Sequence, residues 1–225
     1  MGPLIGGIPP GAGAALLGAT LAVPLALLVL LPLPSIRARA PGLTPWAALP
    51  ALVAGLTVPE GTALELPWLV IGVRLELDPL ARPFLLLAGV LYAGAGAFLL
   101  RARKPVWLCG FFLAALAGNL GVILAPGAVG FYSFYSLMGL AIYGLVIAPG
   151  GRRAHRAANV YIVFTVVGEV LLFGALVAAE PSGAGAGVVP MVLAGLGIKL
   201  GLVPLHLWVP LAYGAAPPAA GAVLG

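Results

Sequence analysis

Charged residues are scarce in this sequence, and their scarcity indicates its class. Asp, Glu, Lys and Arg make up 8% of the 225 residues, whereas hydrophobic residues make up 62%. Soluble domains are about a quarter charged, so a chain with this few charges cannot cover a water-facing surface. A surface that faces lipid needs no polar side chains, although the backbone N–H and C=O groups must form hydrogen bonds within the protein. The composition therefore excludes an ordinary soluble domain and indicates an integral membrane protein.

Metal-binding and nucleophilic side chains are also few. Cys109 is the only cysteine, so the chain cannot form an internal disulfide or supply the cysteines of an iron–sulfur cluster or a cysteine-rich zinc site. The two histidines, His155 and His206, are too few and too far apart for a haem or metal site. No nucleotide fingerprint or nucleophile constellation is visible. We therefore predict no metal site, no bound cofactor and no chemical catalysis by this chain.

Long apolar runs separated by charged or Gly/Pro breaks predict an all-α polytopic fold of about seven transmembrane helices. The second run is short and carries Pro50. The predicted spans are Ala14–Leu33, Thr44–Val58, Pro79–Leu100, Pro105–Ala125, Ala128–Ala148, Ala157–Ala179 and Gly187–Trp208.

The loop charges predict an orientation for these spans. No basic residue precedes Ala14, whereas Arg37 and Arg39 follow the first run, so it is a first helix with its N-terminus outside rather than a secretory signal. The loops after spans one, three and five are basic and those after spans two and six are acidic, which places the basic loops in the cytoplasm. We interpret the basic clusters as topology anchors, not as lipid-specific or nucleic-acid patches. The four tryptophans fall near predicted span ends, as an aromatic belt requires. The residues concerned are Arg37, Arg39, Arg101, Arg103, Lys104, Arg152, Arg153 and Arg156 on one side, and Glu60, Glu65, Glu76, Asp78 and Glu180 on the other.

Two charged residues remain deep inside predicted spans. Glu169 and Lys199 each lie about twelve residues, or about 18 Å, into the sixth and seventh spans from opposite ends. A charge at that depth costs at least about 2.5–3.5 kcal/mol, so opposite charges on consecutive antiparallel helices favour pairing. The pair is either a static salt bridge or part of a proton relay. Intramembrane ionisable residues usually mark ion paths, which favours the relay.

Other polar residues of the spans give weaker indications. Asn119 is interpreted as an interhelical hydrogen bond more readily than as part of a path. Ser136 belongs to a polar stretch of the fifth span. Pro204 removes a backbone hydrogen bond from the seventh span, which predicts a proline-broken helix beside Lys199. His206 follows two residues later, where proton exchange and a structural role are equally open.

Three segments carry a resemblance to a known family. The stretch Lys199-Leu-Gly-Leu-Val-Pro-Leu-His-Leu-Trp-Val-Pro210, followed by Ala216-Pro-Pro218, resembles the lysine-bearing seventh helix of the antiporter-like membrane subunits. These are subunits of respiratory complex I, Mrp cation/proton antiporters and membrane-bound nickel–iron hydrogenases. Leu77-Asp-Pro-Leu-Ala-Arg-Pro-Phe84 resembles the family's entry to helix three, and Phe131-Tyr-Ser-Phe-Tyr-Ser-Leu-Met-Gly-Leu140 resembles its aromatic-rich helix five.

The resemblance implies an ion half-channel driven by a buried glutamate–lysine pair. Lys199 takes the lysine position, but the glutamate position falls on Ser136, which carries no charge. Glu169 is the intramembrane carboxylate available to replace it, so the hypothesis is a relocated Glu169–Lys199 pair with His206 along the path. Asn119, Ser136, Pro204 and Asp78 are candidate supporting residues. Past helix seven, Val209-Pro-Leu-Ala-Tyr213 lacks the Asp and His that the family carries there.

The sequence thus predicts a non-catalytic membrane subunit of a redox-driven proton- or sodium-translocating complex of the NADH:quinone oxidoreductase or hydrogenase type. Residues 1–78 form an N-terminal part, and 79–225 form the channel-like part, which ends a few residues into an eighth helix. The second half-channel is expected on another polypeptide, or the chain is a truncated product. The alternatives are a non-conducting structural subunit and an Mrp-like cation/proton antiporter component. Expected partners are the lipid bilayer of a prokaryotic inner membrane, other membrane subunits and a redox module that holds the redox cofactors, with no nucleic acid.

Overall fold

The computed structural model describes residues 10–69, 72–101, 106–179 and 187–224 and is mostly helical, at 79%. The chain separates into two compact units, residues 1–138 and 139–225, which are considered one at a time. Arg103, Lys104 and Glu180, used above to predict the orientation, lie outside the described residues. The functional division after residue 78 remains a prediction.

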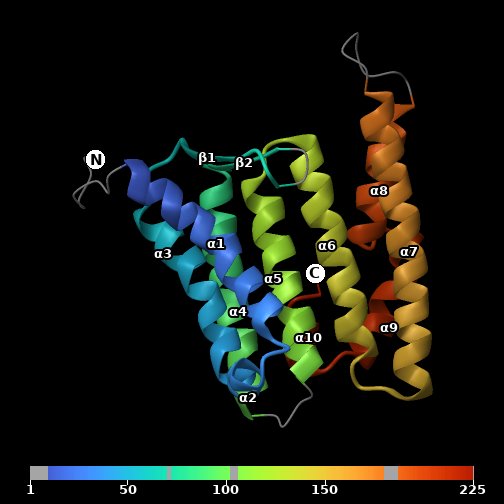
Figure 1. Ribbon diagram of the computed structural model, residues 1–225. Helices are drawn as coiled ribbons and strands as arrows, with labels where there is room; N and C mark the ends of the chain where they lie inside the picture. Colours follow the sequence, from blue (N-terminus) through green and yellow to red (C-terminus); the bar gives the residue numbers. More distant parts are fainter. Residues whose placement is uncertain (1–9, 70–71, 102–105, 180–186, 225) are drawn as a thin grey trace. The chain divides into compact units, whose positions relative to one another are not determined.

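The first unit holds most of the apolar helices (Figure 1). Its elements are α1 (Pro10–Leu30), α2 (Pro34–Leu43), the 3-10 helix η1 (Thr44–Ala48), α3 (Leu49–Thr57), β1 (Thr62–Leu66), β2 (Val73–Leu77), α4 (Ala81–Arg101), α5 (Val106–Leu124) and the start of α6 (Ala128–Ile147). The second unit contains the rest of α6, α7 (Gly151–Ala178), α8 (Val188–Lys199), η2 (Leu205–Leu207), α9 (Trp208–Ala215) and α10 (Pro218–Gly221).

Five helices of the described chain are long and apolar enough to cross a bilayer: α1, α4, α5, α6 and α7. They match the first and the third to sixth predicted spans. The second predicted span, Thr44–Val58, does not form one helix: a 3-10 turn leads into the nine residues of α3. Prolines cause this, because Pro45 and Pro50 each remove a helix N–H donor. The preceding segment, predicted as a loop, is helix α2, so helical structure runs from Pro34 to Thr57 without a gap.

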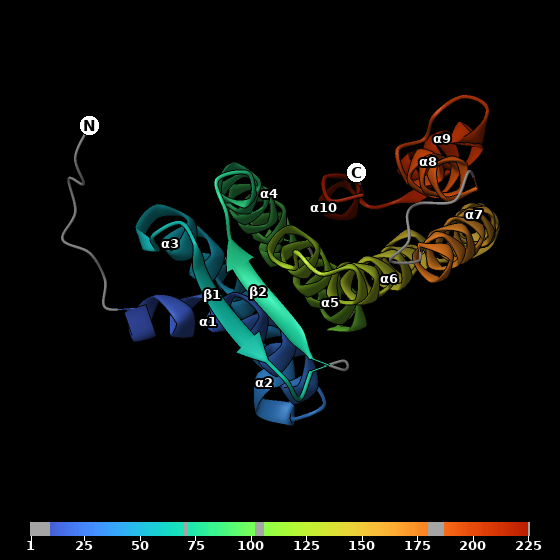
Figure 2. The ribbon, with the colours of Figure 1, turned by 90° about the horizontal axis from the view of Figure 1, so that it is seen from above.

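The prediction of an all-α fold needs a second correction, because β1 and β2 form an antiparallel hairpin. In β2 the residues alternate, so that Val73, Leu75 and Leu77 are buried on one face. On the other face Arg74 lies opposite Glu65 in the register and pairs with Glu76 at 2.8 Å. The hairpin lies across α1 and also contacts α5, which gives its apolar face a partner (Figure 2).

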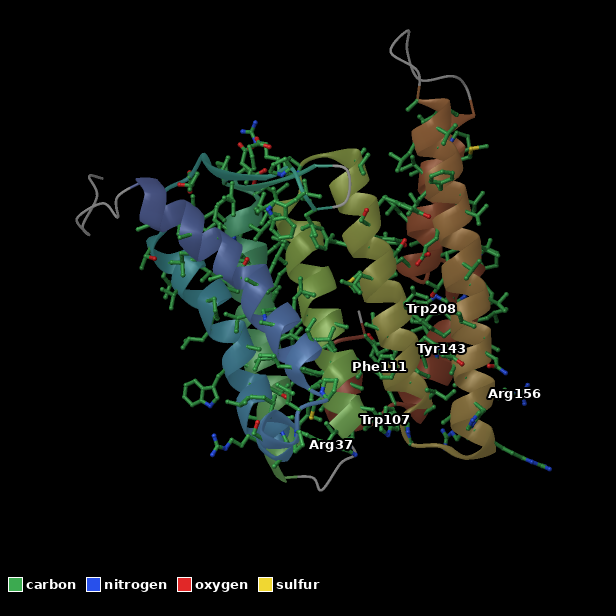
Figure 3. All side chains as sticks on the ribbon, viewed as in Figure 1. Arg37, Trp107, Phe111, Tyr143, Arg156 and Trp208 are labelled. Atoms are coloured by element: carbon green, nitrogen blue, oxygen red, sulfur yellow. The ribbon has the colours of Figure 1, made fainter. Side chains whose placement is uncertain are left out.

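The two ends of the first unit carry different charges. Arg37 on α2 and Trp107 at the start of α5 lie at the same end of this unit (Figure 3). The hairpin, with Glu65 and Glu76, lies at the other end (Figure 1), and Glu60 and Asp78 flank it in the sequence. This is the separation of charge that the sequence predicts for the first unit; which end faces the cytoplasm stays a prediction.

Arg82 ties two helices of this unit together. Its Nη1 and Nη2 donate to the Gly55 and Val58 carbonyl oxygens at 2.7 Å each, and its Nε donates to Glu60 Oε1 at 3.1 Å. The guanidinium of α4 therefore satisfies carbonyl groups at the C-terminal end of α3, which have no partner within the helix.

We expect Arg82→Lys to destabilise the protein by about 1–3 kcal/mol, because an ammonium cannot replace the fork that serves two carbonyls at once. Thermal unfolding in a mild detergent measures the effect. Arg74→Lys is the matched control, since Arg74 is half exposed and pairs with carboxylates only. Equal melting temperatures for the two variants would show that the hydrogen bonds from Arg82 to the α3 carbonyls contribute nothing to stability.

Candidate functional site

The seventh predicted span breaks beside Lys199, as the sequence predicts, but at a different residue. Helix α8 ends at Lys199, five residues before Pro204. The Leu202 N–H bonds to the Gly197 carbonyl at 2.9 Å and the Gly201 N–H to that of Ile198 at 3.1 Å. Gly201 has a φ of +65°, so this is a Schellman motif with glycine in the left-handed position. Glycine ends the helix, and Pro204 follows it.

Trp208 reinforces this break from the beginning of α9. Its Nε1 donates to the Ile198 carbonyl oxygen at 2.7 Å, a carbonyl in the last turn of α8. Only 3% of Trp208 is exposed. The expectation that it joins an aromatic belt is therefore wrong for this tryptophan, because its indole is used inside the second unit. Trp46, Trp68 and Trp107 are exposed.

Two glycines let α7 and α8 pack at close range. A Cβ on Gly168 would lie 3.2 Å from the Gly195 carbonyl oxygen, and one on Gly195 would lie 2.9 Å from the Gly168 carbonyl oxygen. Small residues at a crossing let helix backbones touch in a membrane protein. Glu169 is next in sequence to the first glycine, and Lys199 is one turn beyond the second. This crossing is what brings the two charged residues together.

The two charged residues lie at similar depth along their antiparallel helices. Glu169 is nine residues before the end of α7 at Ala178, about 14 Å at 1.5 Å per residue. Lys199 is eleven residues after the start of α8 at Val188, about 17 Å. Glu169 is near enough to Lys199 for its carboxylate to act electrostatically on the ammonium. That the two residues work as a relocated pair stays a prediction.

A tyrosine that the sequence analysis did not select stands beside the lysine. Lys199 Nζ donates to the Tyr161 hydroxyl at 3.3 Å and lies 5.8 Å from its ring centroid. The Tyr161 hydroxyl donates in turn to the Gly139 carbonyl oxygen at 3.2 Å. Tyr161 is 1% exposed, and its ring meets Trp208 edge to face at 5.2 Å. The lysine is therefore held by a hydroxyl whose own position is fixed from two sides.

Gly139 on α6 connects this hydroxyl to the carboxylate. A Cβ on Gly139 would lie 2.8 Å from Glu169 Oε1 and 2.9 Å from Thr165 Cγ2. A larger residue here would force the Glu169 carboxylate and the Thr165 methyl group to shift. Lys199, Tyr161, Gly139 and Glu169, hereafter the lysine cluster, thus share one location within the second unit, where Tyr161 and Gly139 are buried and the two charged residues are partly buried.

A spacing in α7 could have identified Tyr161. Tyr161, Thr165 and Glu169 stand four residues apart, which places them on one face of a helix. Tyr161 and Thr165 are buried, and so are Gly168, Leu172 and Ala175. The spacing of the apolar residues of α7 does not indicate which face is buried. The four-residue spacing of Tyr161, Thr165 and Glu169 does.

The remaining predicted path residue of this unit, His206, lies in η2. Its Nδ1 is buried and has no hydrogen-bond partner among the described residues. Neither a hydrogen bond nor an ion pair connects it to the lysine cluster within the described chain. A buried imidazole nitrogen of this kind can bind a water molecule or exchange a proton. The role of His206 on the ion path stays a prediction. Pro204 lies in the turn that leads to it.

The other predicted residues belong to the first unit. Asn119 Nδ2 donates to Met138 Sδ at 3.6 Å, an interhelical contact between α5 and α6. Ser136 Oγ is buried and has no partner among the described residues. Asp78 Oδ1 accepts the Ala81 N–H at 2.5 Å and caps the start of α4. The structure gives Asn119 and Asp78 local roles; a part for any of the three in ion movement is not tested.

We expect Tyr161→Phe to keep the fold, to lower stability by about 1 kcal/mol and to slow proton movement. The change removes the hydroxyl that lies between Lys199 and the Gly139 carbonyl, while the ring keeps its contact with Trp208. Dye-detected proton uptake into native membrane vesicles and thermal unfolding measure the two effects. Tyr143→Phe on α6 is the matched control. Equal uptake in both variants would remove the Tyr161 hydroxyl from the path.

Comparison with known proteins identifies relatives of this chain, although no family model matches it. It is 36% identical over 179 residues to the NADH-quinone oxidoreductase subunit N of Desulforudis audaxviator, covering 67% of this chain and 34% of that protein. It is 33% identical over 178 residues to the uncharacterized protein Rv0083 of Mycobacterium tuberculosis, covering 68% of this chain and 27% of that protein. It is 26% identical over 167 residues to the NAD(P)H-quinone oxidoreductase chain 4 1 of a Picosynechococcus species, covering 66% of this chain and 31% of that protein.

Solved structures show the same fold. The Mrp complex from a Dietzia species contains a chain that matches with a TM-score of 0.74 at 21% identity, covering 94% of this chain and 45% of that one. The membrane-bound sulfane sulfur reductase, an archaeal respiratory membrane complex, contains a chain that matches with a TM-score of 0.69 at 22% identity. The match covers 93% of this chain and 49% of that one. This chain therefore spans about a third or less of the curated relatives and under half of the solved chains. The predicted resemblance is confirmed: this chain is an integral membrane protein whose homologues include NADH-quinone oxidoreductase subunit N and chain 4 proteins, and its fold is that of chains in the Mrp complex and the sulfane sulfur reductase complex.

Proposed function

We propose that this chain is a membrane subunit of a proton- or sodium-translocating respiratory complex and contributes one ion half-channel. The observation that carries the proposal is the lysine cluster. A lysine at the end of a broken helix is bonded to a buried hydroxyl and lies at the depth of a carboxylate on the neighbouring helix. Broken helices at membrane depth mark ion sites in transporters, and intramembrane ionisable residues are functional by default.

In the proposed mechanism, Lys199 takes up and releases the proton that moves along the path. Opposite charges attract, so in this mechanism a change in the charge of Glu169 or Lys199 shifts the proton occupancy of the other. The Tyr161 hydroxyl accepts a hydrogen bond from Lys199 and donates one to Gly139, which keeps the ammonium aimed at a fixed position between exchanges. His206 extends the path past the break of the helix.

The proposal includes the partners that such a subunit needs. Redox cofactors are expected on a soluble or membrane partner. The location follows as a prokaryotic inner membrane. Proton and sodium coupling remain alternatives, because the lysine cluster itself does not distinguish the ion that is finally exported.

Purification of the chain from native membranes under mild conditions, with mass spectrometry of what co-purifies, tests this assignment. Partners with flavin, iron–sulfur or nickel–iron centres are the expected result and name the type of complex. Proton uptake driven by the electron donor, measured in vesicles with and without the chain, completes the test. A chain that purifies alone, or only with itself, contradicts the assignment.

One observation favours a second function, a non-conducting structural subunit. Ser136 stands where the resemblance implies a glutamate, so the usual pair is not present in this chain. A structural subunit would tolerate loss of the Lys199 charge or fail to assemble without it, whereas a conducting subunit would assemble and lose coupled ion movement. A self-contained antiporter of the Mrp type would instead move ions when reconstituted alone.

A further inference from the structure

An open groove of about 590 Å³ lies at the N-terminal end of α7, away from the lysine cluster. Its polar part is formed by Arg152, His155, Arg156 and Asn159. One to two turns further along the same helix, its apolar part is formed by Val160, Val163 and Phe164. A single groove therefore joins a cationic end to an apolar end.

The cationic end carries charge that the described chain does not neutralise. Ion pairs among the described residues involve Arg74 and Arg82, and none reaches Arg152 or Arg156. Both arginines are exposed and stand four residues apart, on one face of the helix. His155 Nδ1 lies 2.8 Å from the Gly151 carbonyl oxygen, which leaves Nε2 for a ligand. Figure 3 shows Arg156 near this end of α7.

A second, smaller groove adjoins the first. Its volume is about 390 Å³, and Arg152 and Arg156 line it together with Arg153, Pro210 and Leu211. Arg153 is the arginine turned toward α9, since its Nη2 would lie 3.1 Å from a Cβ on Gly214. Arg152 and Arg156 therefore serve both grooves, and each groove has an apolar wall.

The length of α7 places the groove at a membrane surface. Its 28 residues span about 42 Å, whereas the hydrocarbon core is about 30 Å thick, so roughly eight residues project beyond it. If the C-terminal end lies at the opposite boundary, the arginines reach the headgroup layer, Val160 begins the hydrocarbon layer, and Val163 and Phe164 lie about one turn inside it. The exposed valines further along, Val166, Val167 and Val170, continue an apolar surface.

We propose that this groove binds an anionic phospholipid, with the phosphate held by Arg152 and Arg156 and an acyl chain along Val160, Val163 and Phe164. This replaces, for these two arginines, the interpretation from sequence that they are topology anchors only. Guanidinium groups bind phosphate oxygens in a forked geometry. A soluble anion or a nucleic acid would contact the cationic end only. A lipid contacts both ends, with its headgroup at the arginines and its acyl chain along the apolar residues. The inference does not depend on ion conduction by this chain.

Native mass spectrometry of the purified full chain tests the proposal, with equimolar phosphatidylglycerol and phosphatidylcholine offered in a mild nonionic detergent. The expected result is preferential retention of phosphatidylglycerol. The double change R152Q/R156Q should reduce that preference by roughly 30-fold, since each arginine near an anionic surface contributes about a fivefold factor. The control R37Q/R39Q removes the same charge from exposed arginines of α2 and should keep the preference.

A second variant protects the test against misfolding. Asn159→Glu adds a negative charge inside the groove at an exposed position and should also weaken retention of phosphatidylglycerol. Equal retention of both lipids by the unaltered chain would overturn the proposal. So would equal loss in R152Q/R156Q and R37Q/R39Q, which indicates general basic attraction. Complete displacement of the lipid by inorganic phosphate would also overturn it and reduce the groove to a small-anion site.

Discussion

Replacement of Lys199 by alanine is expected to abolish proton movement through this subunit while the chain stays in the membrane with its partners. The change removes the titratable group of the lysine cluster, and positioned proton-transfer groups contribute about 100-fold or more to rate. It also leaves the Glu169 carboxylate without its positive partner, so we expect a loss of stability of about 3–5 kcal/mol beside the loss of proton movement. Dye-detected proton uptake in native vesicles and gel analysis of the solubilised complex measure the two properties together.

Lys199→Arg separates a relay from a static ion pair. Arginine keeps the positive charge beside Glu169 but does not give up its proton in a protein. A relay should therefore fail in Lys199→Arg as it does in Lys199→Ala, whereas a static pair should work with either cation. Full proton uptake in the arginine variant, or normal uptake in the alanine variant, would contradict the proposed role of Lys199.

The long apolar helices could be predicted from the sequence because bilayer thickness and hydropathy determine them. The hairpin was missed although Val73-Arg-Leu-Glu-Leu77 alternates strictly and follows a glycine. That signal is five residues long and stands between much stronger helical ones. The second predicted span was wrong because hydropathy says nothing about where Pro45 and Pro50 remove helix hydrogen bonds. The positions of the charges and prolines therefore predict the helical segments of Pro34–Thr57 better than hydrophobicity does.

The lysine cluster was predictable only in part. Lys199 and Glu169 stand out because charges at membrane depth are rare and costly. Tyr161 carries no such cost, and Gly139 is one of 33 glycines, so neither differs from its neighbours in composition. Their roles arise from helix packing, since the Gly168–Gly195 contact and the Schellman motif at Gly201 decide which atoms meet. The same packing places Trp208 inside the second unit instead of at a membrane surface.

Replacement of Glu169 by glutamine is expected to slow proton movement by roughly 100-fold and to destabilise the protein by about 3–5 kcal/mol. The amide has the volume of the carboxylate, so it fills the same space beside Gly139 and only the negative charge is lost. The positive charge of Lys199 is then buried without compensation, which is the costly way to break a buried pair. Thermal unfolding in mild detergent and vesicle proton uptake measure these effects.

A double-mutant cycle shows whether Glu169 and Lys199 act as a pair. Lys199→Ala removes the charge that Glu169→Gln leaves uncompensated, so the double variant should be more stable than Glu169→Gln alone. For residues that interact directly, the coupling free energy should be about 0.5–3 kcal/mol. Glu65→Gln on the hairpin is the matched control, because its carboxylate is largely exposed and its ion pair with Arg74 is weak. Strict additivity of the Glu169 and Lys199 changes, with undiminished proton uptake in Glu169→Gln, would remove Glu169 from the path and leave Lys199 to work with a carboxylate supplied by another chain.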